Sequence, residues 1–267
     1  MNAHTEAPAS KAAARPGIEV LNRAVDLLAA FTQGPGTTLS LAEMARRTGL
    51  PKPTLHRLLA ALDLLGLVEK TPGGYQLGIR LFELGEHVPR KQKLREAALP
   101  FMQDLFEASH DTVHLAVLDG TEVVYLERLR SHKPTNVASR VGGRLPAYCT
   151  GVGKALLAFN PEAAIKVLAM PLVARTPYTI TNHQVLAEEL ARIRTTGLSY
   201  AREENSIGIV CVAAPIMIDD RAIGAVSVTC SPPKTDVDRY ASAVKAAALG
   251  IRRSIARTPG LRPNDIP

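Results

Sequence analysis

The 267-residue sequence lacks the features that mark several classes of protein. It contains no tryptophan, and its three cysteines, Cys149, Cys211 and Cys230, have no CxxC spacing. An odd number of cysteines without that spacing favours neither a disulfide framework nor a zinc ribbon, so we interpret them as reduced thiols. No stretch approaches the ~20 apolar residues of a membrane helix, and the first residues show no basic-then-apolar signal pattern. We therefore expect a cytoplasmic protein that contacts no membrane.

The composition is that of a packed soluble protein, with 46% hydrophobic and 21% charged residues. The length suits one large domain or two smaller ones, and we predict two. The net charge of +7 favours an anionic partner. Most of this charge lies in residues 1–95, which hold 13 Lys and Arg against 8 Asp and Glu, whereas the remainder holds 19 against 17.

Helical spacing begins at residue 18, after an Ala- and Pro-rich stretch, residues 1–17, that we expect to be a flexible arm. A second, short helix is predicted between Ser40 as its N-cap and Gly49, with Glu43 at the capping-box position. The first helix is predicted from the apolar residues Leu21, Ala24, Val25, Leu28 and Phe31.

A third helix and a hairpin follow. Pro51 and Pro53 fit only the first turn of a helix, where a missing N–H costs nothing. The turn at residues 48–50 joins this helix to the second one as a helix-turn-helix. Two short strands, 67–70 and 75–77, surround a Pro-Gly-Gly turn. These elements predict a winged helix-turn-helix over residues 18–78. The apolar face of the third helix is predicted to be Leu55, Leu58, Leu59, Leu62 and Leu65.

The opposite face of the third helix is basic, and no acidic residue lies between Glu43 and Asp63. A DNA major groove accepts one helix, whose N-terminal part meets the base edges. Arg57 suits either a guanine or a phosphate, and Lys70 adds a cation beside the hairpin tip. A solvated basic face and an ordinary exposed turn are the alternatives. We predict contacts to double-stranded DNA from Arg46, Lys52, Pro53, Thr54, His56, Arg57 and Lys70.

Residues 79–95 are predicted to be a helical linker, residues 96–258 a second domain and residues 259–267 a tail. Strands joined by hairpins and mixed with helices indicate an α+β domain with an antiparallel sheet. Its strands are expected at 113–118, 122–128, 209–217 and 222–229, and its helices near 99–106 and at 151–159, 161–169, 184–196 and 236–258.

Four segments carry distinctive motifs. Residues 49–85 read GLPKPTLHRLLAALDLLGLVEKTPGGYQLGIRLFELG, and later segments read LPAYCTGVGKALLAF (145–159), REENSIGIVCVAAPI (202–216) and GAVSVTCSP (224–232). The first resembles the DNA-binding domain of the IclR family of bacterial transcriptional regulators. The other three resemble the effector-binding domain of that family, in the same order.

The resemblance implies a transcriptional regulator, not an enzyme, that binds a near-palindromic operator as a homodimer or tetramer. It also implies a GAF-like α+β domain that senses a small metabolite, with no cofactor or metal, and control of catabolic genes. The family's pocket corresponds here to Gly151, Val152, Ala201, Cys211, Ser227 and Thr229.

These pocket residues suit a small organic acid. N–H groups at the start of a helix at 151–153 favour an anion, and Ser227 and Thr229 project from one face of a strand. Glyoxylate-sensing relatives carry an acidic residue where this chain has Ala201, so the resemblance implies a ligand other than glyoxylate or pyruvate. Because several members of the family regulate aromatic catabolism, an aromatic acid is our hypothesis. Simple core packing of these residues is the alternative.

Three other motifs are incomplete. A Walker A loop ending at Lys154 would need Gly in place of Tyr148 and Ser or Thr in place of Ala155. His110 and His114 have the spacing of a helical metal pair, but residues 113–118 alternate like a strand, so we predict no metal site. A hydrolase based on Cys211 lacks an identifiable base. A small-molecule-processing enzyme and a non-DNA-binding oligomeric scaffold are the alternative functions, and the basic third helix weighs against the scaffold.

Overall fold

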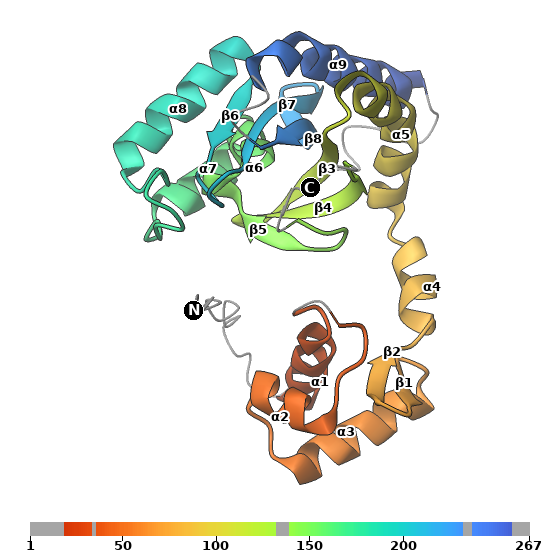
Figure 1. Cartoon of the computed structure of the whole chain (residues 1–267). Helices are drawn as coiled ribbons and strands as arrows, with labels where there is room; N and C mark the ends of the chain where they lie inside the picture. The colour runs from red at the N-terminus through yellow and green to blue at the C-terminus, as the bar shows by residue number, and fades with distance from the viewer. Residues whose placement is uncertain (1–18, 34–35, 132–138, 232–236, 258–267) are drawn as a thin grey trace. The chain divides into compact units, whose positions relative to one another are not determined.

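The computed structural model describes residues 19–33, 36–131, 139–231 and 237–257. The predicted arm and tail lie outside these ranges. The chain forms two compact units that divide between Val88 and Pro89 (Figure 1). None of the helices that the structure describes has the length and apolarity of a membrane span.

The first unit is a helical domain with a hairpin, as predicted. Ser40 caps α2 by accepting a hydrogen bond from the N–H of Glu43, and Gly49, with φ of 69°, ends it. Leu39 pairs with Tyr75, which ties the hairpin to the start of α2. The elements are α1 Glu19–Ala30, α2 Leu41–Thr48, α3 Lys52–Leu64, β1 Val68–Thr71, β2 Gly74–Leu77 and α4 Arg80–Glu86.

Parts of the predicted apolar faces of this unit are wrong. Leu65 follows the last turn of α3 and is 49% exposed, and Leu21 and Val25 of α1 are at least 60% exposed. The reason is that the face of α1 that packs into the unit runs through Ala24, Leu27 and Leu28, whereas Leu21 and Val25 lie on a second apolar stripe beside it. The buried core consists of Leu27, Ala30, Phe31, Leu39, Met44, Leu55, Leu58, Leu59, Leu62 and Val68.

The second unit is built on a six-stranded antiparallel sheet in the order β5-β4-β3-β8-β7-β6. The predicted strands and helices are present, and β5 and β6 are short edge strands that the sequence pattern did not indicate. The strands are β3 Thr112–Asp119, β4 Glu122–Leu129, β5 Arg144–Pro146, β6 Ser199–Arg202, β7 Val210–Ile218 and β8 Arg221–Cys230. The helices are α5 Pro89–Ser109, η1 Ala147–Cys149, α6 Gly151–Ala158, α7 Pro161–Leu168, α8 His183–Thr196, η2 Val237–Tyr240 and α9 Ala241–Arg257.

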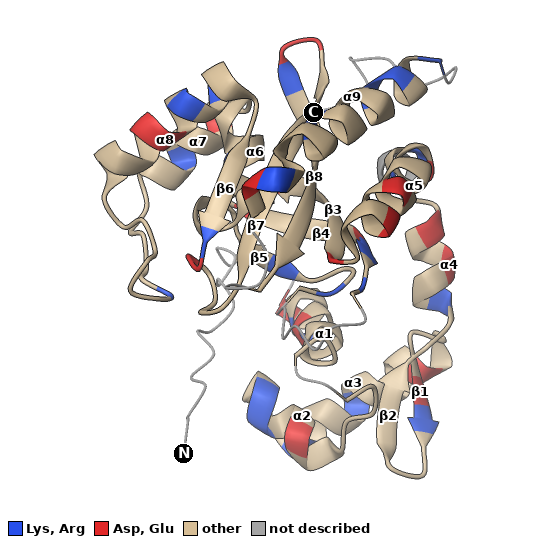
Figure 2. Cartoon of the chain, turned by 45° about the horizontal axis from the view of Figure 1, so that its top comes forward, with Lys and Arg blue, Asp and Glu red and all other residues tan. Residues whose placement is uncertain are grey.

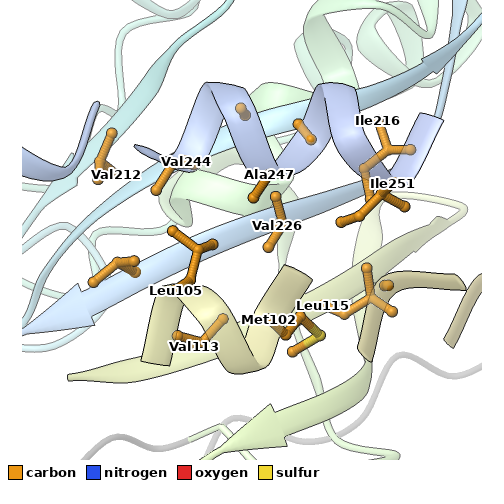
Figure 3. Close-up of a cluster of buried hydrophobic side chains, with 14 of the residues drawn as sticks. Met102, Leu105, Val113, Leu115, Val212, Ile216, Val226, Val244, Ala247 and Ile251 are labelled. Carbon is orange, nitrogen blue, oxygen red and sulfur yellow. The ribbon is translucent and has the colours of Figure 1, made fainter. Parts of the chain in front are cut away.

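Helices cover both faces of this sheet. On one face α5 and α9 pack together, and Figure 3 shows Met102 and Leu105 from α5 and Val244 from α9 gathered around Val226 of β8. On the other face lie α6, α7 and α8. Side chains along a strand point alternately to the two faces of the sheet. Strand residues that alternate with those packed against α5 and α9 therefore point toward α6. They include the polar positions of the candidate pocket.

The predicted linker consists of two helical segments. α4 ends at Glu86, and α5 runs without a break from Pro89 to Ser109, with the exposed Pro100 inside it. The helix expected near 99–106 is therefore continuous with the end of the linker. Pro100 removes one backbone donor, which a long helix tolerates when its neighbours are packed against the sheet.

Candidate functional site

The start of α3 presents the predicted DNA-contacting residues on one surface. Pro51 precedes the helix with φ of −60° and ψ of 143°, and Pro53 occupies its first turn. The leucines on the other side are buried. Figure 2 shows basic residues on α2, α3 and β1. We call this the α3 surface; it consists of the exposed Lys52, Pro53, His56 and Arg57 and the half-buried Thr54.

The two arginines of α2 have different surroundings. The Arg46 side chain is 73% exposed and pairs with Glu43 at 2.6 Å, whereas the Arg47 side chain is 14% exposed. Arg47 also donates to the carbonyls of Ala30 and Gln33, so it closes the end of α1. The two guanidinium groups lower the pKa of Glu43 to about 2. Arg46 is therefore the α2 arginine that is accessible to DNA. Lys70 is exposed on β1, beside the hairpin turn.

A cavity in the second unit lies between the start of α6 and the sheet. Its floor crosses three adjacent strands, because Thr229 pairs with Cys211 and Cys211 pairs with Ala201. All six predicted pocket residues line it. The space open to the centres of water-sized molecules is about 50 Å³, several times what one water needs. The residues that the sequence did not indicate are His114, Tyr125, Leu145, Cys149, Thr150, Glu204, Asn205, Ser206 and Ile209.

The glycines at the start of α6 serve close packing. Thr150 caps the helix by accepting from the N–H of Gly153. A Cβ on Gly151 would collide with the Cys211 sulfur, and one on Gly153 would collide with the Ala147 backbone. These glycines therefore allow the first turn of α6 to pack against the strands. This close packing explains the Gly-x-Gly sequence without a nucleotide-binding role.

His114 stands at one end of the cavity floor, on β3, as the strand pattern predicted. Its Nδ1 lies 3.2 Å from Thr229 Oγ1 and its Nε2 lies 2.6 Å from Ser139 Oγ. Burial lowers the pKa of His114 to about 3, and the charge of Arg128 acts in the same direction. The imidazole is therefore neutral at physiological pH. Among the described residues, no three His, Cys, Asp or Glu side chains gather as a metal site.

We expect His114 to make the second unit less stable in acid. An unfolded histidine has a pKa near 6.5. Between pH 7 and pH 5, His114 therefore becomes protonated in the unfolded chain but stays neutral in the folded chain. The free energy of unfolding should fall by about 2 kcal/mol from this residue. Urea unfolding of the wild type and His114→Gln at both pH values measures it, because only the wild type should show this part of the loss. Equal pH dependence in the two proteins would contradict the assignment.

The two cavity thiols are poor nucleophiles. Burial raises the pKa of Cys149 to about 12 and also raises that of Cys211, although the N–H groups of Gly151 and Ala201 face the Cys211 sulfur and oppose the shift. A thiol that stays protonated does not attack a substrate. This chemistry weighs against a cysteine hydrolase and favours Cys211 as part of the cavity wall.

A buried ion pair lies beside the cavity. The Lys154 side chain is 1% exposed, and its Nζ lies 2.5 Å from Glu204 Oε1 and 3.7 Å from Glu189 Oε1. Burial raises the pKa of Glu204, and the Lys154 charge opposes that rise. The N–H of Arg202 also faces the carboxylate, but among the described residues none makes a hydrogen bond to the buried Glu204 Oε2. Lys154, the lysine of the incomplete Walker A motif, thus forms a buried ion pair with Glu204.

Family comparisons agree with both units. The model of the IclR helix-turn-helix domain matches residues 20–72, and that of the bacterial transcriptional regulator IclR C-terminal domain matches residues 86–253. The transcriptional regulator XynR of Escherichia coli is 32% identical over 248 residues, which cover 90% of this chain and 98% of that protein. The transcriptional repressor IclR of Escherichia coli is 31% identical over 241 residues, which cover 86% of this chain and 88% of that protein.

Solved structures give the same result. An IclR homologue from Microbacterium hydrocarbonoxydans, in complex with 4-hydroxybenzoate, superposes with a TM-score of 0.82 at 31% identity, over 89% of this chain and 99% of that one. The Thermotoga maritima IclR structure has a TM-score of 0.71 at 30% identity, over 88% and 97%. These relatives are regulators rather than enzymes, and the chain belongs to the IclR family of bacterial transcriptional regulators.

Proposed function

We propose that this regulator binds its operator as a homodimer through the α3 surface, with Arg46 and Lys70 at its margins. A small organic acid in the cavity of the second unit changes its affinity for DNA. Residues 18–78 bind DNA, residues 96–258 bind the effector, and the protein acts in the cytoplasm. The observation that supports the effector site most strongly is that six residues from four separate segments line one cavity together with His114.

The cavity favours an acid with an apolar body. Among its described lining residues none is Lys or Arg, so the carboxylate would be held by hydroxyl groups, above all those of Ser227 and Thr229. Val152, Leu145 and Ile209 supply apolar wall. The complex of the Microbacterium relative with 4-hydroxybenzoate supports an aromatic acid as the first candidate.

An exposed apolar stripe on α1 supports the homodimer. Val20, Leu21 and Val25 are at least 60% exposed in the single chain. A second copy packed on this stripe would remove apolar surface from water. Dimerisation would also place two α3 helices on one face of DNA, about 34 Å or a multiple of it apart. A tetramer would repeat this arrangement.

Arg57→Ala should weaken operator binding by about 1–3 kcal/mol if Arg57 contacts a base, and relax selectivity at one position. Fluorescence anisotropy of labelled upstream DNA, at two salt concentrations and with competitor DNA, measures both effects. Arg192→Ala is the matched control, because it removes an arginine from α8 in the second unit. Unchanged affinity and selectivity in Arg57→Ala would remove Arg57 from the DNA contact.

Ser227→Ala should leave operator affinity unchanged and reduce the response to an acid effector. Ser227 is 1% exposed and lines the cavity opposite the start of α6, and a lost hydrogen bond costs about 0.5–1.5 kcal/mol, or up to roughly tenfold in affinity. The same anisotropy assay, titrated with benzoate and 4-hydroxybenzoate, measures the response. A normal response in the variant would exclude Ser227 from ligand binding.

A further inference from the structure

Glu204 is an acidic residue on the wall of the effector cavity. It follows β6, two residues beyond the end of that strand, and lies beside Asn205 and Ser206 on the cavity wall. The residue is 6% exposed. An acid ligand in this cavity must therefore share it with a fixed negative charge, which constrains what the ligand can present to this wall.

The two oxygens of the Glu204 carboxylate have different surroundings. Oε1 accepts from Lys154 Nζ at 2.5 Å, and Lys154 is not among the residues that line the cavity. Oε2 is buried and has no hydrogen bond from the described part of the chain. Burial raises the pKa of Glu204, whereas the charge of Lys154 opposes that rise and favours the ionised carboxylate. A buried, ionised oxygen without a donor is costly, and a donor on a ligand would remove that cost.

The turn that carries Glu204 is held in place by hydroxyl groups from a neighbouring loop. Thr176 Oγ1 donates to the Glu203 carbonyl at 2.7 Å, and Thr179 Oγ1 donates to the Glu204 carbonyl at 2.6 Å. On the other side of the turn, the N–H of Gly208 donates to the Glu203 carboxylate at 2.7 Å. The acceptor at Oε2 is therefore preorganised rather than free to turn away, which favours selective binding.

We propose that the effector is a hydroxy acid whose hydroxyl group donates to Glu204 Oε2, with its carboxylate on the β8 side of the cavity, at the hydroxyl groups of Ser227 and Thr229. This inference rests on the proposed acid site. The carboxylate cannot face Glu204, because two negative charges in a buried site repel each other. The floor spans β8, β7 and β6, and two strand spacings measure about 10 Å. That length accommodates a compact hydroxy acid with its two polar groups at opposite ends.

Glu204 also lines a surface groove with Lys154 and Glu189. On that side the groove already holds the carboxylate of Glu189, whose charge raises the pKa of Glu204. A donor from the cavity side meets no second carboxylate, because Glu189 is not among the described residues that line the cavity. The groove is the alternative location of a donor to Glu204 Oε2.

The test is isothermal titration of the full chain with 4-hydroxybenzoate, benzoate and 4-methoxybenzoate. The wild type should bind 4-hydroxybenzoate about 10-fold to 100-fold more tightly than benzoate, as expected for a hydrogen bond to a charged group. In Glu204→Gln the amide oxygen replaces Oε1 at Lys154, so the amide N–H₂ faces the cavity. That preference should fall at least about fivefold, and 4-methoxybenzoate, whose ether oxygen only accepts, should bind more tightly than it does to the wild type.

Glu188→Gln is the matched control, because this glutamate of α8 lies on the surface and bonds Gln184. Should Glu204→Gln fail to fold, Lys154→Met with Glu204→Gln removes both buried charges together and allows the same ligand comparison. Equal affinity of the wild type for benzoate and 4-hydroxybenzoate would overturn the hydroxyl contact but leave the acid site intact. An unchanged preference in Glu204→Gln would also overturn it. Binding of none of the three acids would overturn the acid site itself.

Discussion

Lys154→Ala should lose about 3–5 kcal/mol of the free energy of unfolding of the second unit. The substitution leaves the Glu204 carboxylate buried without its cation, and removal of one partner of a buried ion pair is far more damaging than loss of the pair. Urea unfolding followed by tyrosine fluorescence measures it. The chain has no tryptophan, and only Tyr75 lies in the first unit, so the signal reports the second unit.

Two variants make this prediction specific. Lys154→Met combined with Glu204→Gln removes both charges and should recover most of the lost stability, because apolar or neutral replacements of a buried pair are often tolerated. Arg202→Ala removes an exposed arginine whose pair with Asp238 is more than half exposed on both sides, and should cost less than about 1 kcal/mol. If Lys154→Ala were no less stable than Arg202→Ala, Lys154 would not be offsetting the cost of burying the Glu204 carboxylate.

The sequence predicted the elements of the first unit well because its signals are local. A proline pair fixed the start of α3, a serine N-cap and a left-handed glycine bounded α2, and the Pro-Gly-Gly turn defined the hairpin. The exposed Leu21 was misplaced because a helical period identifies an apolar stripe but not which of two stripes packs inside. Which stripe is buried depends on tertiary contacts, and a helical period in the sequence carries no information about those contacts.

The candidate cavity could be predicted only in part for the same reason. The resemblance supplied residues such as Cys211 and Ser227, whereas His114 and Glu204 reach the cavity through strand pairing and an ordered turn. His114 and Ser227 are 113 residues apart in the chain, yet they are directly opposite each other in the sheet. One local signal was available: Thr150, an N-cap just before the Gly-x-Gly segment, marked the start of α6.

Leu59→Ala should unfold the first unit and abolish operator binding while leaving effector binding in the second unit intact. Leu59 is fully buried in the core of the first unit, and truncation of such a leucine costs about 2–5 kcal/mol. A domain of this size has little more stability than that to lose. Leu64→Ala, in the same helix at a leucine that is 89% exposed, should change stability by less than about 0.5 kcal/mol. Operator anisotropy and acid titration of both variants separate the units, because loss of acid binding in Leu59→Ala would show that the cavity depends on a folded first unit.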